Sequence, residues 1–374
     1  MIWKVIDYIK RKKEIFKNFD SNTKYMLSGT YILDESIKYM TRDDEDTKKR
    51  AYKMLQADYY PFFIRVIIYF LRRTLFRKKI IIPEQELPLS GFSGNVLRPV
   101  RSSNGYSDSK IFDLKHNKVL SIFTDRKEYS TVVQTYDYFN RHFPMPNILW
   151  TNDDQLLIME ELVLFQPKNT WEEEDYEWVI SDLFKRYYVY FNESKIKGNF
   201  TYKSPTELLN PLLGDSEIQL IKSNIHPELI DMKIPYLKLH GDLWTSNTLL
   251  LKEEKTQIKY IDWEYSKDFW FFYDLFNMMW LEYYVNNNFI YVKRYITGDY
   301  DEDFKKIFSL FHLHFQPKFK LDYLNLFFLN FFEERLANLN EVDKKESLNK
   351  YKGLLQKVNR EINDIELMTR LYIG

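Results

Sequence analysis

The sequence predicts an α+β fold with two lobes, a small β-rich lobe followed by a mostly helical lobe, and a helical extension in front of them. Three observations indicate this division. Apolar runs of strand length, separated by turns, fill residues 91–163, whereas long aromatic segments with helical spacing fill residues 164–374. Residues 1–90 differ from both, because their apolar positions recur at helical spacing among many basic side chains.

Composition indicates a folded protein. The 374 residues are 45% hydrophobic and 18% aromatic, which is enough for a substantial core. There is no cysteine, which excludes a disulfide framework and a cysteine-based zinc site and fits a reducing compartment such as the cytoplasm. Lys and Arg together number 54, as do Asp and Glu. This balance argues against a dedicated nucleic-acid-binding protein, whose surface is usually strongly basic.

Residues 1–90 are locally basic, with 19 Lys or Arg against 12 Asp or Glu. Apolar side chains between Ile2 and Phe16 fall at helical spacing beside the basic run Lys10–Lys13, which predicts an amphipathic helix. A second candidate helix covers Pro61–Lys79. Neither contains the roughly 20 consecutive apolar residues that cross a bilayer, and the start has no signal-peptide cleavage site. Two interpretations remain open: helices packed on the rest of the protein, or peripheral association with an anionic membrane.

A segment rich in Pro and Gly, residues 80–95, is expected to lead into the β-rich lobe. Strands are predicted at Val96–Arg101 and Lys110–Leu114, with a turn of small polar residues between them. Backbone amides of such a turn can cover nucleotide phosphates, and the candidates are Ser103, Asn104 and Gly105. The same residues are also compatible with an ordinary hairpin turn.

Further strands of the small lobe are predicted at Lys118–Phe123, Asn147–Trp150 and Leu156–Met159. A helix at Tyr129–Phe143 separates the first of these strands from the second.

The most informative stretch is LHGDLWTSNTLL, Leu239–Leu250, which IDWEYS follows at Ile261–Ser266. Apolar runs on either side predict short strands, and a polar turn at residues 253–256 predicts a hairpin. The polar residues therefore lie at strand ends and in a loop, and they are His240, Asp242, Asn247 and Asp262. Two carboxylates and an amide brought together in this way suit phosphoryl transfer, in which one carboxylate orients the acceptor and oxygen ligands hold magnesium on the phosphates.

HGDLWTSN and IDWEYS, followed by a helix beginning near Tyr273-Asp274-Leu275, resemble the aminoglycoside phosphotransferase and choline kinase family of small-molecule kinases. The resemblance covers about Val96–Tyr284 and implies the family's two-lobed, protein-kinase-like fold. It also implies ATP and Mg²⁺ as cofactors. The acceptor it implies is a hydroxyl of a small molecule: a sugar, an amino sugar or an amino alcohol.

The same resemblance implies a role for each residue of the motif. Asp242 corresponds to the catalytic base, and Asn247 and Asp262 correspond to the magnesium ligands. His240 corresponds to an organiser of the catalytic loop, and Asp274 to an aspartate with a structural part. In the small lobe, the resemblance implies a hinge whose backbone from Glu161 to Val163 would bond the adenine edge, so that Glu161 and Val163 are candidate nucleotide-binding residues.

One position departs from the family pattern. The predicted strand KVLSIF places Ser121 where a phosphate-binding lysine is expected, and no clear glutamate partner lies in the next helix, which Glu128 precedes. Lys110 on the neighbouring strand could replace the lysine. Alternatively, the alignment slips and Lys118 or Lys127 has this role, or the chain is a non-catalytic relative. Retention of both metal ligands and the base favours the first two explanations.

The helical lobe is predicted from long aromatic segments, whose rings are expected to form its core. Helices are expected at Tyr176–Phe191, Phe269–Tyr284, Leu321–Leu339 and Lys344–Leu371. The sequence thus predicts a cytoplasmic phosphotransferase that binds no nucleic acid. Two alternatives are a non-catalytic nucleotide-binding or scaffold protein, and a kinase of a cell-envelope saccharide or lipid-linked precursor at the membrane periphery.

Overall fold

The computed structural model describes residues 13–34, 39–55, 79–102, 105–208, 216–251, 257–336 and 341–373. The chain divides into two compact units, of which the first comprises residues 1–137, 144–172 and 250–259. The second comprises residues 138–143, 173–249 and 260–374. The α+β class is confirmed: the first unit contains a large antiparallel sheet, and the second is mostly helical.

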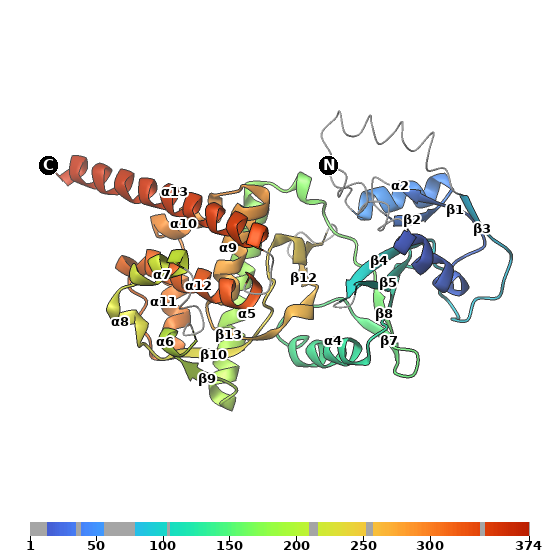
Figure 1. Ribbon diagram of the computed structural model, residues 1–374, viewed down its shortest axis with the longest axis horizontal. Coiled ribbons are helices and arrows are strands. Elements are labelled where there is room, and N and C mark those ends of the chain that lie inside the picture. The colour runs from blue at the N-terminus through green and yellow to red at the C-terminus, as the bar shows by residue number, and fades with distance from the viewer. Residues whose placement is uncertain are drawn as a thin grey trace. The chain divides into compact units, whose positions relative to one another are not determined.

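The sheet of the first unit has eight strands in the order β3-β1-β2-β4-β5-β6-β8-β7 (Figure 1). Every strand pairs antiparallel with its neighbours. The strands are β1 (Gly29–Asp34), β2 (Tyr39–Arg42), β3 (Lys79–Ile82), β4 (Val96–Ser102), β5 (Gly105–Asp113), β6 (Lys118–Ile122), β7 (Ile148–Asn152) and β8 (Leu157–Glu161). The unit also contains two helices, α2 (Glu45–Met54) and most of α4 (Arg126–Phe139).

Alternation along the central strands buries apolar side chains on both faces of this sheet. Leu97, Ile111 and Leu120 belong to one buried cluster, together with side chains of the N-terminal segments. Their sequence neighbours belong to a second cluster, in which Ala51 of α2 is buried: Val96, Phe112 and Val119. Helix α2 therefore covers part of the second face.

The N-terminal region differs from the helical extension that the sequence predicts. Residues 13–22 are helical and α2 follows, but β1, β2 and β3 add three strands to the sheet. Short runs such as GTYILD and KIII satisfy their backbone hydrogen-bonding groups by pairing with other strands. Helical spacing and charge do not indicate such pairing. Most of the two predicted basic helices lies at residues 1–12 and 56–78, outside the described residues. No helix among the described residues is long and apolar enough to cross a membrane.

The second unit is built mainly from helices around a small antiparallel sheet, β13-β10-β9. Its strands are β9 (Thr201–Lys203), β10 (Ile234–Leu239) and β13 (Lys267–Trp270). Its helices include α5 (Glu173–Lys197), α6 (Pro205–Leu208), α7 (Ser216–Ser223), α8 (Pro227–Ile230), α9 (Tyr273–Asn286), α10 (Ile290–Thr297), α11 (Asp301–Leu310), α12 (Lys320–Phe331) and α13 (Glu341–Ile373). A separate two-stranded pair joins β11 (Thr248–Leu250) to β12 (Ile258–Tyr260).

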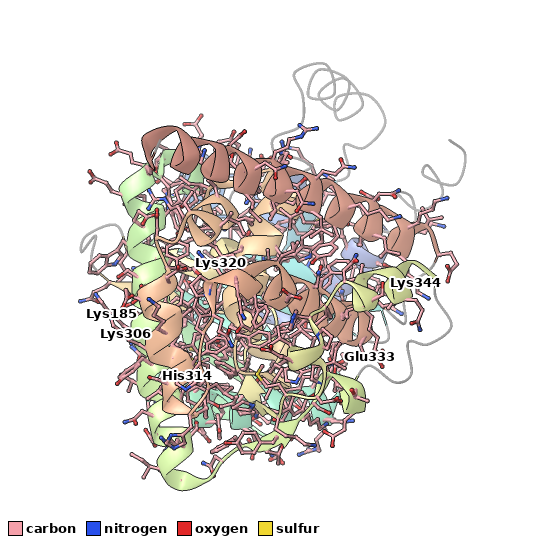
Figure 2. All side chains as sticks on the ribbon, turned by 90° about the vertical axis from the view of Figure 1, so that its left-hand side faces the viewer. Lys185, Lys306, His314, Lys320, Glu333 and Lys344 are labelled. Carbon is pink, nitrogen blue, oxygen red and sulfur yellow. The ribbon has the colours of Figure 1, made fainter. Side chains whose placement is uncertain are left out.

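The aromatic segments of this unit form its core, as the sequence predicts. Trp280 of α9 is buried, and the rings of Phe328 and Tyr351 stack with centroids 3.7 Å apart. Polar contacts also lie within this packing: Nζ of the buried Lys320, which is labelled in Figure 2, is 2.7 Å from Oδ1 of Asp301. Helix α9 begins later than expected, because the residues before it form β13 and pair with β10 instead of continuing the helix.

Candidate active site

The predicted catalytic loop follows β10 and has a backbone that requires glycine at one position. Gly241 has φ +78°, a left-handed conformation that residues with a Cβ adopt at a cost. A Cβ there would lie 2.5 Å from the carbonyl oxygen of Tyr265 and 2.7 Å from Cε2 of Phe269. The loop therefore packs against the 265–269 segment so closely that only glycine fits, which holds its neighbours His240 and Asp242 in place.

Asp274, at the start of α9, anchors the same loop by accepting hydrogen bonds from its backbone. Its Oδ2 accepts from the backbone N–H of His240 at 2.8 Å, and its Oδ1 accepts from that of Gly241 at 2.9 Å. The Tyr187 hydroxyl donates to the same carboxylate. The side chain is fully buried, and this burial raises the pKa of Asp274 to about 6 in spite of the three donors.

His240 is buried and uses both ring nitrogens. Nε2 is 2.9 Å from the carbonyl oxygen of Ile261, and Nδ1 accepts from the backbone N–H of Asp242 at 3.2 Å. The ring also packs on Trp263, with centroids 4.4 Å apart. Burial lowers the pKa of His240 to about 4. A neutral imidazole with a proton on Nε2 satisfies both contacts, so the ring joins the loop to the IDWEYS segment rather than exchanging protons near neutral pH.

The Asp242 carboxylate is held at both oxygens. Oδ1 accepts from the guanidinium of Arg335 at 2.7 Å, and Oδ2 accepts from Nδ2 of Asn247 at 3.2 Å. The Asn247 amide also donates to the Asp242 carbonyl oxygen at 2.7 Å. Burial raises the pKa of Asp242, while Arg335 and Asn247 act in the opposite direction. The negative charge of Asp262 also acts to raise this pKa.

Asn247 and Asp262 provide oxygen atoms of the kind that magnesium prefers. Because Nδ2 of Asn247 donates to Asp242, its Oδ1 is the atom that has lone pairs for a cation. Asp262 has φ 61° and ψ 54°, a left-handed conformation that is uncommon for residues other than glycine and is tolerated best by Asn and Asp. In the part of the chain that the structure describes, no three His, Asp or Glu side chains form a metal-binding group. A magnesium ion here would depend on two protein oxygens, phosphate oxygens and water.

Two contacts from α9 support this loop and were missed from the sequence. The Thr245 hydroxyl donates to the buried carboxylate of Glu282, and Nδ2 of Asn277 donates to the carbonyl oxygen of Leu243 at 3.1 Å. Asp274, Asn277 and Glu282 follow one another along α9 at intervals of three and five residues. This spacing directs all three side chains toward one half of the helix surface. Buried polar residues recurring on one side of an aromatic helix were the signal that could have revealed them.

Arg335 is the other residue that the sequence did not predict. It follows Asp242 by 93 positions, in the π-helical turn Phe332–Leu336. No local pattern marks it, since nothing near residue 335 resembles the catalytic motif.

Ser121, where the resemblance predicts a lysine, and Lys110, the candidate replacement, lie in the first unit. They are direct partners in the antiparallel ladder between β5 and β6, so their side chains emerge on the same face of the sheet. This is also the face of Phe112 and Val119, which α2 partly covers. The register therefore brings a lysine beside Ser121, the position at which the sequence resemblance leads one to expect a lysine.

The other two lysines considered for this role are placed differently. Nζ of Lys118 donates to the carbonyl oxygen of Gly91 at 2.7 Å, and Lys127 is an exposed residue in the first turn of α4. Glu128, expected to precede this helix, lies in its first turn instead, because Asp125 caps the helix by accepting from the backbone N–H groups of Lys127 and Glu128. Burial raises the pKa of Asp108 on β5, and the negative charge of Glu128 acts in the same direction.

The predicted hinge follows β8. Oε2 of Glu161 accepts from Nζ of Lys259 at 2.9 Å and from Nδ2 of Asn147 at 2.8 Å. Burial acts to raise the pKa of Glu161, but these two donors outweigh it and the pKa is lowered. The side chain of Glu161 is thus engaged within its own unit, and the buried Val163 follows two residues later.

The predicted phosphate loop is only partly described. Ser102 pairs with Gly105 at the ends of β4 and β5, while Ser103 and Asn104 lie outside the described residues. The proposed turn of the β11–β12 hairpin, residues 253–256, also lies outside them.

No protein-family model matches the sequence, and no curated protein matches it. Similar solved structures include choline kinase LicA from Streptococcus pneumoniae, at 10% identity and a TM-score of 0.35, covering 80% of this chain and 100% of that one. They also include macrolide 2′-phosphotransferase MphH from Brachybacterium faecium, at 12% identity and a TM-score of 0.41, covering 68% and 91%. A thermostable mutant of aminoglycoside phosphotransferase APH(4)-Ia is 12% identical with a TM-score of 0.43, covering 71% and 95%.

Proposed function

We propose that this protein is an ATP- and Mg²⁺-dependent phosphotransferase that phosphorylates a hydroxyl of a small molecule, namely a sugar, an amino sugar or an amino alcohol. The observation that supports this most directly is the set of hydrogen bonds around Asp242. Its carboxylate accepts a hydrogen bond from Asn247, and the carbonyl oxygen of Asn247 accepts from the backbone N–H of Ile261, next to Asp262, at 3.0 Å. These contacts support a common site for the three motif residues.

In this proposal Asp242 orients the hydroxyl of the acceptor and accepts its proton. Most of the rate acceleration in phosphoryl transfer comes from positioning and from neutralising charge, so a base held on a rigid loop suits the reaction. Contacts from Asp274, His240 and Gly241 supply that rigidity. Asp262 and Asn247 would hold magnesium, which when bound neutralises phosphate charge and retains several of its waters.

On the nucleotide side we propose that Lys110 contacts the phosphates in place of a lysine at position 121. Lys110 is favoured for this role because it is paired directly with Ser121 between β5 and β6. Lys118 is disfavoured because its Nζ already donates to the carbonyl oxygen of Gly91. The adenine edge would bond the backbone around Glu161 to Val163. Backbone amides near Gly105 would complete the phosphate contacts, together with Ser103 and Asn104.

A second candidate function is nucleotide binding without phosphoryl transfer, as in a scaffold protein. Ser121 favours it, because a buried serine supplies no charge to the phosphates. The retained motif of Asp242, Asn247 and Asp262 favours the enzyme.

Calorimetric titration of ATP, with and without magnesium, tests the nucleotide site. We expect wild-type protein to bind ATP only when magnesium is present, and Asp262→Ala to lose that binding while remaining folded by circular dichroism. Absence of binding to folded wild-type protein would refute the proposed site.

A panel of hydroxyl acceptors then separates the two candidate functions. A phosphotransferase consumes ATP in the presence of one acceptor class, and Asp242→Asn should lower that turnover by about 10²-fold or more while leaving ATP affinity within a few-fold. Unchanged turnover in Asp242→Asn would show that Asp242 is not the base. Magnesium-dependent binding without ATP consumption across the panel would favour the scaffold.

A further inference from the structure

The turn that connects α12 to the segment before α13 reaches the catalytic loop. Residues Phe332–Leu336 form a π-helix, a rare arrangement that is frequent at functional sites. This turn carries three consecutive charged residues, Glu333, Glu334 and Arg335, of which Glu333 is labelled in Figure 2. Glu334 pairs with Lys267 on β13, while Arg335 extends to the loop that contains Asp242. The turn is therefore attached at two points to the elements that flank the candidate base.

The Arg335 side chain is held by three contacts. Its Nη2 donates to the carbonyl oxygen of Gly241 at 2.6 Å and to Oδ1 of Asp242 at 2.7 Å. Its guanidinium carbon lies 4.0 Å from the ring centroid of Tyr265, a cation–π distance. The side chain is 18% exposed, and that of Asp242 is 27% exposed, so the pair is partly shielded from solvent. Within the described residues, the buried Nε of Arg335 has no hydrogen-bond partner.

We infer that Arg335 is a positioning residue for the candidate base and fixes which oxygen of Asp242 faces the acceptor. This inference rests on the proposed function. Arg335 engages Oδ1 at 2.7 Å, whereas the contact of Asn247 with Oδ2 is longer, at 3.2 Å. Oδ2 is thus the oxygen that receives the acceptor hydroxyl. A charge-assisted bond to arginine is strong and directional, so it restricts rotation of the carboxylate more than the neutral amide can.

The bond to the Gly241 carbonyl extends this role to the backbone. One nitrogen of Arg335 bridges a main-chain oxygen and a side-chain oxygen of adjacent residues, so the loop and the carboxylate move together. Tyr265 supports the guanidinium from its face, and its own carbonyl oxygen lies against Gly241. A displacement of about 1 Å at a catalytic group can lower a rate about 10²-fold. Removing the guanidinium should therefore reduce turnover without altering the nucleotide contacts.

Hydrogen exchange of the catalytic loop tests the inference independently of enzyme activity. Four variants are compared with wild type: Arg335→Gln, Arg335→Lys, Lys267→Gln and Arg294→Gln. Lys267→Gln loosens the same turn without touching Asp242. Arg294 is a matched control in the same unit, since it is also partly buried, at 23% exposed, and pairs with Glu173 and Glu177.

We expect Arg335→Gln to increase exchange in residues 239–247 about tenfold, Arg335→Lys to recover part of the protection, and both controls to match wild type. Wild-type exchange in Arg335→Gln would overturn the inference. An equal increase in Lys267→Gln, or an increase throughout the second unit, would also overturn it, because the effect would then belong to the turn or to global stability.

Steady-state kinetics supply the second readout, with the acceptor found by the panel. Arg335→Gln should lower kcat about 10²-fold and leave the KM for ATP within about twofold, and Arg335→Lys should recover part of kcat. An unchanged kcat would overturn the inference. If wild-type protein transfers phosphate to none of the acceptors, the proposed function fails, whereas the exchange experiment still decides whether Arg335 positions the loop.

Discussion

Replacing Gly241 by alanine offers a direct test of the loop geometry, because the chain contains a matched control. Gly241 and Gly198 both have left-handed backbones, with φ +78° and φ +67°. A Cβ at Gly241 meets the Tyr265 carbonyl oxygen at 2.5 Å, whereas a Cβ at Gly198 meets nothing within 4 Å. The two substitutions therefore share the backbone cost and differ in the collision.

The expected magnitudes follow from this difference. The left-handed conformation costs alanine about 1 kcal/mol, which we expect for Gly198→Ala. The collision at Gly241 adds about 2 kcal/mol, because the nearest atom is a backbone oxygen that can yield only if the 265–269 segment moves. We expect Gly241→Ala to lower the free energy of unfolding by about 3 kcal/mol in total.

Equilibrium urea unfolding, followed by tryptophan fluorescence, measures both variants against wild type. Phosphoryl transfer by Gly241→Ala should also fall, since His240 and Asp242 flank the altered residue, while Gly198→Ala should keep wild-type activity. Equal destabilisation by the two substitutions would refute the argument that close packing at Gly241 holds the loop.

Two further predictions concern charged residues. Burial raises the pKa of Asp274 to about 6, above its unfolded value of about 4, so the folded state binds the proton more tightly. This group should therefore reduce the free energy of unfolding by about 3 kcal/mol as pH rises from about 4 to about 6, and Asp274→Asn should lack that contribution; parallel stability curves for the two proteins would contradict this. Lys110→Met should weaken the magnesium-dependent affinity for ATP about tenfold or more in calorimetry, whereas Lys118→Met should change it less than threefold, and the reverse order would assign the role to Lys118.

Local patterns in the sequence were sufficient to predict the central strands of the sheet and the catalytic hairpin. Most strands from Val96 to Glu161 and those around Leu239 and Tyr260 occur close to their expected positions. An exception is β5, which begins at Gly105 instead of Lys110 and so includes part of the predicted polar turn. Apolar alternation and turn residues act over a few positions, so a short window contains the information. The order of His240, Asp242, Asn247 and Asp262 could also be recognised locally, because all four lie in the short segments next to the ends of β10, β11 and β12.

Contacts between distant segments were decided by the tertiary structure alone. The N-terminal strands and β13 form because other strands are available for pairing, and their own residues do not indicate that such strands are present. The register that sets Lys110 opposite Ser121 depends on how two strands align. Arg335 reaches Asp242 across 93 positions because α12 and the π-helical turn bring it there. The sequence by itself determined which chemical groups belong to the candidate site, and the packing of the helical unit decided which side chains hold them in position.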